Sequence, residues 1–137
     1  MHKSTDVARS ALAVVQASWN LSARNWDVDA LTAVYTDDAL FFGGRPGHAV
    51  GPRAIREYFA SYEGVIESAT LELVEQHFIP VTDDCFLAQG FGEFLFVLGG
   101  SRVSRSRLRT TLLIVRQQNE WKIRQHHFSA SPESPPI

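Results

Sequence analysis

Apolar residues recur at three- and four-residue spacing through the first fifth of the chain, which predicts an amphipathic helix. The pattern covers residues 8–26 and consists of small and aromatic side chains. Asp27 interrupts it and can cap a second, short helix. The expected buried face of that helix consists of Leu31, Val34 and Tyr35. A short strand at residues 39–42 and a third helix that opens at Gly51 complete this half of the chain.

The apolar spacing changes from about four residues to two beyond Gly64. Four strands are therefore predicted, over residues 69–80, 85–98, 104–117 and 120–129. Strands of this length exceed the usual size, so we expect the sheet to bend strongly, with Gly90 as one point where it can do so. Helices followed by a meander of strands predict an α+β fold, in which helices pack on one face of a curved antiparallel sheet and a pocket is enclosed.

The composition is that of an ordinary globular chain, with 45% hydrophobic and 20% charged residues over 137 positions. We predict one domain over residues 1–130 and an irregular, proline-rich tail at 131–137. A net charge of −2 offers no basic field, and no apolar run has the length of a membrane span. We therefore expect neither nucleic acid nor membrane as a partner. Cys85 is the single cysteine, which excludes an internal disulfide and makes the cytoplasm the expected location.

Two stretches of the sequence carry a family resemblance. One covers residues 19–42 and continues in the run G-P-R-A-I-R-E-Y-F; the other is the C-terminal run from Arg109 to Pro132. They resemble the nuclear transport factor 2-like (SnoaL-like) superfamily. The branch that looks most similar contains the association domain of calcium/calmodulin-dependent kinase and its small bacterial relatives. The matching positions in the last strand are Trp121, Ile123, His127, Ser129 and Pro132.

This resemblance implies a cone-shaped, cystatin-like fold, in which the curved sheet wraps around about three N-terminal helices. It does not imply one activity, because the superfamily contains isomerases, dehydratases, cyclases, hydrolases and assembly domains. A ketosteroid-isomerase-like member needs a carboxylate and a phenol at positions that fall near Gly43 and Trp19 in this chain. An epoxide-hydrolase-like member needs two carboxylates bridged by an arginine, and the late strands contain no R-x-D. Neither reaction is expected.

The pair His126-His127 does not predict a metal site. Adjacent side chains of a strand point to opposite faces, so the two cannot bind one ion; we predict no metal and no cofactor. By the same alternation His127 shares a face with Trp121, Ile123, Gln125 and Ser129. The first two of these indicate a buried face. His127 is then either a satisfied core residue or a donor in the pocket, and it is the best candidate for a general acid or base.

Arg105, Arg107 and Arg109 alternate along one face of the predicted strand 104–117. One alternative is that this face is solvated or covered by a partner subunit. The other is that at least Arg109 points inward and binds a carboxylate. Glu93 is the one acid of the strand 85–98, and it is either an exposed residue or the ion-pair partner of an arginine. The candidate ligand-binding residues are Trp19, Tyr62, Glu93, Arg109, Gln125 and His127.

Three functions remain open. The first is a pocket for a small, anionic or carboxylate-bearing organic molecule, with no particular reaction specified. The second is an association module that forms a homodimer or higher oligomer through the outer face of the sheet. The apolar residues expected on that face are Phe86, Phe94, Phe96, Leu112 and Ile114. The third is a lyase, isomerase or cyclase that uses His127 as general acid or base. A homodimer is expected in every case.

Overall fold

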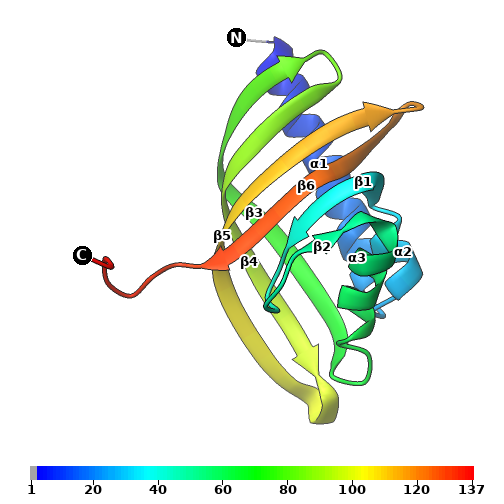
Figure 1. The fold of residues 1–137 in the computed structure, drawn as a ribbon, viewed down its shortest axis with the longest axis vertical. Coiled ribbons are helices and arrows are strands. Elements are labelled where there is room, and N and C mark those ends of the chain that lie inside the picture. Colours follow the sequence, from blue (N-terminus) through cyan, green and yellow to red (C-terminus); the bar gives the residue numbers. More distant parts are fainter. Residues whose placement is uncertain (1–2) are drawn as a thin grey trace.

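The computed structural model describes residues 3–137 and places the helices before the long strands (Figure 1). The first elements are α1 (Lys3–Ala23), α2 (Val28–Thr32), β1 (Tyr35–Phe42), β2 (Ala49–Val50) and α3 (Gly51–Ala60). They are followed by β3 (Ile66–Thr82), β4 (Cys85–Leu98), the 3-10 turn η1 (Gly99–Ser101), β5 (Arg102–Gln117) and β6 (Glu120–Ala130). Residues 131–137 form no helix or strand. None of the helices within residues 3–137 is long and apolar enough to span a membrane.

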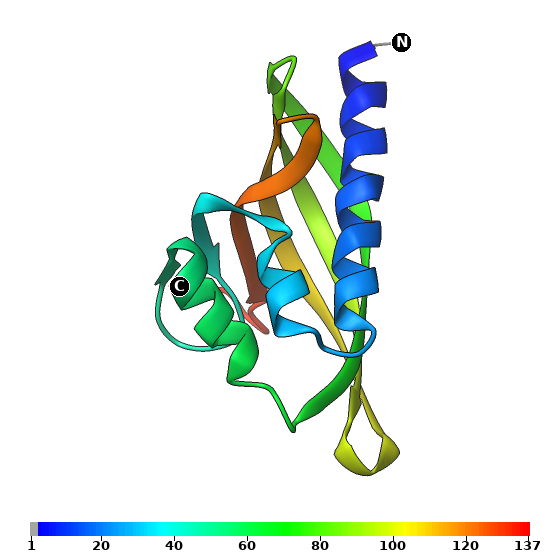
Figure 2. The ribbon, with the colours of Figure 1, turned by 90° about the vertical axis from the view of Figure 1, so that its right-hand side faces the viewer.

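The strands form one sheet in the order β2-β1-β6-β5-β4-β3. Neighbours are antiparallel except β1 and β6, which run parallel. The strands β3, β4 and β5 have 17, 14 and 16 residues and curve together along the molecule (Figure 1). Helix α1 lies along these long strands, whereas α2 and α3 lie together near β1 (Figure 2). The predicted α+β fold, with a curved sheet around three helices, is confirmed.

The second helix is shorter than expected, and Tyr35 does not belong to it. Asp27 caps α2 as predicted, because its carboxylate accepts a hydrogen bond from the N–H of Ala30 at 3.1 Å. The helix ends at Thr32, since the carbonyl of Val34 already accepts a hydrogen bond from the N–H of Ile123 at 3.0 Å. This bond starts the pairing of β1 with β6, so residues 35–42 form a strand.

A β-bulge in β3 lies against Gly90, the predicted bending point. Pairing between β3 and β4 shifts between Val74 and His77, and Glu75 inside the shift has a φ of 53°. A Cβ atom on Gly90 would lie 2.5 Å from the carbonyl oxygen of Glu75. Only glycine leaves room for this close approach of two strands, so the position matches the bend expected there.

A second bulge lies in β6 and consists of one extra residue, Arg124. Leu113 of β5 pairs with Gln125, and the next residue, Ile114, pairs with Ile123. Arg124 is left out of this pairing, and its guanidinium contacts the carboxylate of Asp38 at 2.8 Å. Side chains beyond the bulge therefore face opposite to what strict alternation from Ile123 predicts.

The core lies between the helices and the inner face of the sheet. Phe86, Phe94, Leu112 and Ile114 are all buried there. Phe96 is half-buried beside them. The prediction that these five residues lie on the outer face of the sheet is therefore wrong. Both faces of these strands carry apolar residues, so the sequence did not identify the face that the helices cover.

Candidate ligand-binding cavity

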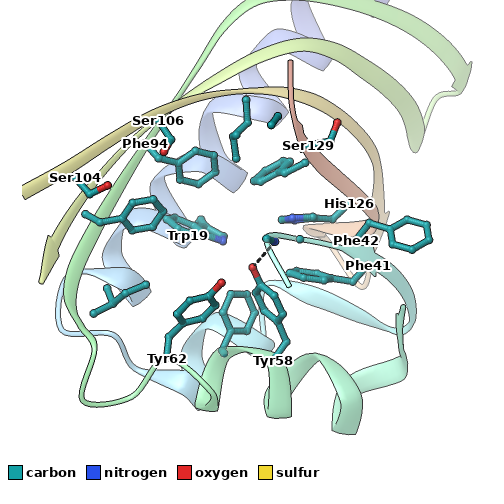
Figure 3. A pocket seen from close by; sticks show the side chains of 18 of the residues that line it. Trp19, Phe41, Phe42, Tyr58, Tyr62, Phe94, Ser104, Ser106, His126 and Ser129 are labelled. Carbon is teal, nitrogen blue, oxygen red and sulfur yellow. Dashed lines mark hydrogen bonds between the residues drawn. The ribbon is translucent and has the colours of Figure 1, made fainter. Parts of the chain in front are cut away.

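A cavity of about 700 Å³ lies between the helices and the inner face of the sheet (Figure 3). Helices α1 and α3, the end of β1 and strands β4, β5 and β6 all contribute to its wall. Its aromatic lining includes Trp19, Phe41, Tyr58, Tyr62, Phe94 and Phe128. Among the described lining residues there is no aspartate, glutamate, lysine or arginine. The cavity has the size and the apolar character of a small-molecule site.

His126 is the buried polar residue of the cavity wall, with only 3% of its surface exposed. Its ring stacks on Phe41, with centroids 4.0 Å apart and planes 18° apart, and its other neighbour is Phe128 at 3.7 Å. The Nδ1 atom lies 2.8 Å from the hydroxyl of Tyr35. The Nε2 atom is buried and has no hydrogen-bond partner among the described residues. The imidazole is thus held in one orientation with a single free nitrogen.

Burial sets the protonation of this pair. It lowers the pKa of His126 well below its ordinary value, and the neighbouring His127 adds to the effect. Burial also raises the pKa of the Tyr35 hydroxyl well above its ordinary value, an effect that the Trp19 indole partly offsets. His126 is therefore neutral and Tyr35 protonated at neutral pH.

Tyr58 and Tyr62 bring two phenols to the opposite wall (Figure 3). The N–H of Gly44 donates a hydrogen bond of 2.8 Å to the Tyr58 hydroxyl. Burial raises the pKa of Tyr58, so the phenol keeps its proton. Gly43 makes this arrangement possible, because a Cβ atom there would lie 2.5 Å from the Tyr58 hydroxyl oxygen. Outside the cavity the guanidinium of Arg45 lies 4.2 Å from the centre of the Tyr62 ring.

Trp19 of α1 provides a further polar atom to the cavity wall. The residue is 3% exposed, and its ring makes edge-on contacts with Trp26 and Phe94. Its indole N–H has no hydrogen-bond partner among the described residues. Trp19 is near enough to Tyr35 to affect the pKa of that phenol, but the N–H does not reach hydrogen-bond geometry with it.

Sequence comparison assigns the chain to a family. The sequence profile of the SnoaL-like domain matches residues 12–133. The chain belongs to the SnoaL-like family. The match covers all elements that form the cavity apart from the start of α1, so the resemblance noted in the sequence is confirmed. A search of curated protein sequences found no significant match.

Solved structures of the SnoaL-like and nuclear transport factor 2-like type share this fold. A protein from Xanthomonas campestris, named as a calcium/calmodulin-dependent protein kinase II association domain, has a TM-score of 0.80 and 18% identity, covering 90% of this chain and 87% of its own. One from Novosphingobium aromaticivorans, named as a scytalone dehydratase, has a TM-score of 0.82 and 11% identity, with 100% coverage of both chains. One from Streptomyces avermitilis, named as a dehydratase, has a TM-score of 0.75 and 15% identity, covering 93% of this chain and 99% of its own. At such identities these likenesses establish the fold alone.

Two of the predicted ligand-binding residues, Trp19 and Tyr62, line the cavity of this SnoaL-like domain. Their contact with a ligand remains a prediction. His127 lies at the edge of the cavity, but it is exposed, and its ring is 5.2 Å from that of Phe42. The prediction that it shares the buried face of Ile123 is wrong, because the bulge at Arg124 reverses the alternation. The two histidines do point to opposite faces, as expected of strand neighbours.

The other three predicted residues lie outside the cavity. Arg109 is exposed on the outer face of β5, so the hypothesis that it points inward is wrong; its neighbours Leu108 and Thr110 face the interior instead. Glu93 is also on the outer face, where its carboxylate contacts Arg107 at 2.8 Å. This is the ion pair that the sequence offered as one alternative. Gln125 is half-buried on the outer face and does not line the cavity.

Sequence reasoning did not select His126 and Tyr58, which line the cavity, or Tyr35, which contacts His126. His126 was assigned to the wrong face because nothing near Arg124, such as a glycine or proline, marks the bulge. Tyr35 was placed in a helix. Tyr58 lies on the third helix, and Gly43 leaves room for its hydroxyl. Two adjacent glycines opposite a tyrosine on the next helix were the available signal.

Proposed function

We propose that the protein binds a small, neutral, largely aromatic or aliphatic molecule in the cavity. The observation that supports this most directly is a cavity of about 700 Å³ with an aromatic lining and two lining residues, His126 and Trp19, that each have a buried, unpartnered nitrogen. A buried polar atom without a partner is costly, and a ligand that bonds to it removes this cost. Apolar pockets with a few fixed polar groups are typical of small-molecule sites.

The charge of the lining argues for a neutral ligand rather than the anionic one expected from the sequence. That expectation depended on the family resemblance and on an inward Arg109 and His127, and both of these residues are exposed. An anion inside the cavity would lie against aromatic rings and a neutral histidine, without a cation among the described lining residues. Burial of such an unpaired charge is strongly unfavourable.

A matched pair of probes tests this proposal. We expect 2-methylnaphthalene to bind in equilibrium dialysis and 2-naphthoate to bind much more weakly, because only the second carries a charge. A Ser106→Trp variant should lose binding, since Ser106 is part of the cavity wall and the larger ring fills the space. Arg105→Trp is the control, because its side chain lies on the outer face. Equal or tighter binding of the naphthoate would contradict the neutral-ligand proposal.

We do not extend the proposal to a reaction. General acid–base catalysis needs a group that accepts and a group that releases a proton at the working pH. The sequence offered His127 for this role, but that residue is exposed at the cavity edge. His126 is the histidine inside, and the low pKa that burial gives it makes it a weak base. The described lining contains no carboxylate to act with it.

A second proposal is self-association through the outer face of the sheet. Four half-buried apolar residues lie on this face, namely Leu87, Phe91, Leu95 and Leu113. The same face carries the acid Glu72 and the bases Arg105 and Arg109, none of which has an ion-pair partner within residues 5–137. A second copy of the chain fits such a face, because its acids can meet the bases of the first copy while the apolar residues are covered.

Sedimentation analysis tests the proposed homodimer. We expect the unmodified chain to sediment as a dimer, and Leu95→Asp and Leu113→Asp to sediment as monomers with a retained circular-dichroism spectrum. Leu21→Asp is the control, because Leu21 is 65% exposed on α1, away from the sheet face. A monomer at tens of micromolar concentration, or a dimer unaffected by both sheet substitutions, would exclude this interface.

A further inference from the structure

Two arrangements of the Tyr35–His126 hydrogen bond are possible, and the number of polar groups that each leaves unpaired indicates which nitrogen of the histidine carries the proton. If Tyr35 donates to Nδ1, the proton of the neutral ring is on Nε2, and one N–H is left without a partner. If Nδ1 donates to Tyr35 instead, both the phenol proton and the Nε2 lone pair are left without partners in the described structure. Buried polar groups are nearly always paired, so the first arrangement is the better one. It gives His126, a residue of the cavity wall, an N–H donor that is covered in the described structure, so that a ligand reaches it by a small shift of the neighbouring rings.

The opposite wall of the cavity also carries hydrogen-bond donors. The oxygen of Tyr58 accepts the hydrogen bond from Gly44, which leaves the phenol proton to be donated. The hydroxyl of Tyr62 also lies near Gly44, since a Cβ atom on Gly44 would be 3.3 Å from it and 3.6 Å from that of Tyr58. The indole N–H of Trp19 can only donate, and it has no partner among the described residues.

Because these groups of the wall are donors, we infer that the ligand of the cavity is a neutral, mostly hydrocarbon molecule with a ketone or other carbonyl group. The carbonyl oxygen accepts hydrogen bonds from His126 and Tyr58. The inference rests on the proposed binding function and makes it narrower. A hydrocarbon skeleton matches the aromatic wall, and a carbonyl oxygen can accept two hydrogen bonds at once. A ligand that only donates would leave the donors of the wall unpaired, which is costly in a buried site.

Three molecules of nearly equal shape separate the alternatives: fluorene has no polar group, 9-fluorenone has an acceptor, and carbazole has an N–H donor. Equilibrium dialysis with the full chain should show 9-fluorenone bound about tenfold more tightly than fluorene, and carbazole no more tightly than fluorene. His126→Phe should reduce the preference for 9-fluorenone over fluorene, whereas His77→Phe on the outer face should leave it unchanged.

The outcomes distinguish this inference from the proposed function. Binding of all three molecules with equal affinity, or a preference for carbazole, would overturn the carbonyl assignment and leave the neutral-ligand proposal intact. No binding of any of the three would count against both. The proton position is also measurable without a ligand, in long-range ¹H–¹⁵N NMR spectra of the folded chain. A protonated Nε2 of His126 is expected, and a protonated Nδ1 would overturn the inference even if His126→Phe failed to fold.

Discussion

The two faces of strand β5 differ in how they use their side chains. On the inner face Leu112 and Ile114 are buried against the helices, and Ser104, Ser106 and Leu108 continue along the cavity. On the outer face Arg107 contacts Glu75 at 2.5 Å and Glu93 at 2.8 Å, and its guanidinium lies 4.5 Å from the ring centre of Phe91. One face of the strand thus belongs to the apolar core, and the other carries ion pairs in contact with water.

This difference indicates where the stability and the binding of the protein originate. Burial of apolar surface contributes free energy in proportion to area, and the inner face contains most of the buried residues. Ion pairs in contact with water contribute little, because water and salt already stabilise the separate charges. Substitutions on the inner face should therefore change stability or ligand binding, and those on the outer face should change association and salt dependence.

The sharpest test compares two adjacent leucines of β5. Leu112 is 1% exposed on the inner face, and Leu113 is half-buried on the outer face. Leu112→Ala should lower the free energy of unfolding by about 2–5 kcal/mol, because it removes buried methyl groups and leaves a cavity. Leu113→Ala should lower it by about 1 kcal/mol or less. Urea denaturation measures both, and equal losses would contradict the assignment of the two faces.

A smaller loss is expected from Gly43→Ala at the cavity wall. The new methyl group would overlap Tyr58 and Phe41, which must move. Overpacking of this kind costs about 1–3 kcal/mol of unfolding free energy, and the displaced phenol should weaken ligand binding as well. Gly99→Ala is the control, since a Cβ atom on Gly99 meets no atom within 4 Å. Unchanged stability and binding in Gly43→Ala would show that Tyr58 is not fixed as described.

The pH dependence of stability tests the burial of His126. Its pKa is lowered in the folded state, so below the unfolded value of about 6.5 the unfolded chain takes up a proton that the folded chain does not. This residue's contribution to stability is complete above that pH and decreases below it, by up to about 1.4 kcal/mol per pH unit. Urea denaturation between pH 7.5 and 5 should show a shallower slope for His126→Gln than for the original chain. His77→Gln, on the outer face, should keep the original slope.

The smallest effect is expected for the ion-pair cluster of the outer face. Arg107→Gln removes the contacts to Glu75 and Glu93, both of which are exposed to water. We expect a slight decrease of the midpoint of thermal unfolding at low salt and no difference at 1 M salt, where surface charges are screened. A large loss that persists at high salt would show that the outer face stabilises the fold more than its exposure indicates.

The fold follows from the sequence largely because the long strands and the first helix have strong periodicity. The turns at Asp83, Gly99 and Gln118 lie between the predicted strands, and the strand bounds differ from the predicted ones by only a few residues. Local patterns were sufficient for these elements. They were not sufficient for Tyr35, which pairs with Ile123 of the parallel strand β6, about ninety residues away in the chain.

The candidate site was less predictable, because it depends on which face of each strand points inward. Strands β4 and β5 are apolar on both faces near Leu112 and Leu113, so alternation alone leaves the direction open. In β6 the unmarked bulge at Arg124 reverses the direction within the strand. Trp19 was found because it lies on α1, where the apolar stripe indicates the buried side, and Tyr62 because it continues the apolar face of α3 just beyond the end of that helix.

The bulge at Arg124 means that the length of β6, as well as its composition, selects the side chains of the cavity. A regular strand of the same length would turn His127 and Ser129 inward in place of His126 and Phe128, whereas deletion of Arg124 alone would remove the bulge and keep His126 and Phe128 on the cavity wall. The extra residue therefore decides which row of side chains forms the cavity wall, and a single-residue deletion at this point is compatible with an unchanged wall. An ungapped alignment with a SnoaL-like sequence whose last strand is regular would compare residues from opposite faces of the sheet.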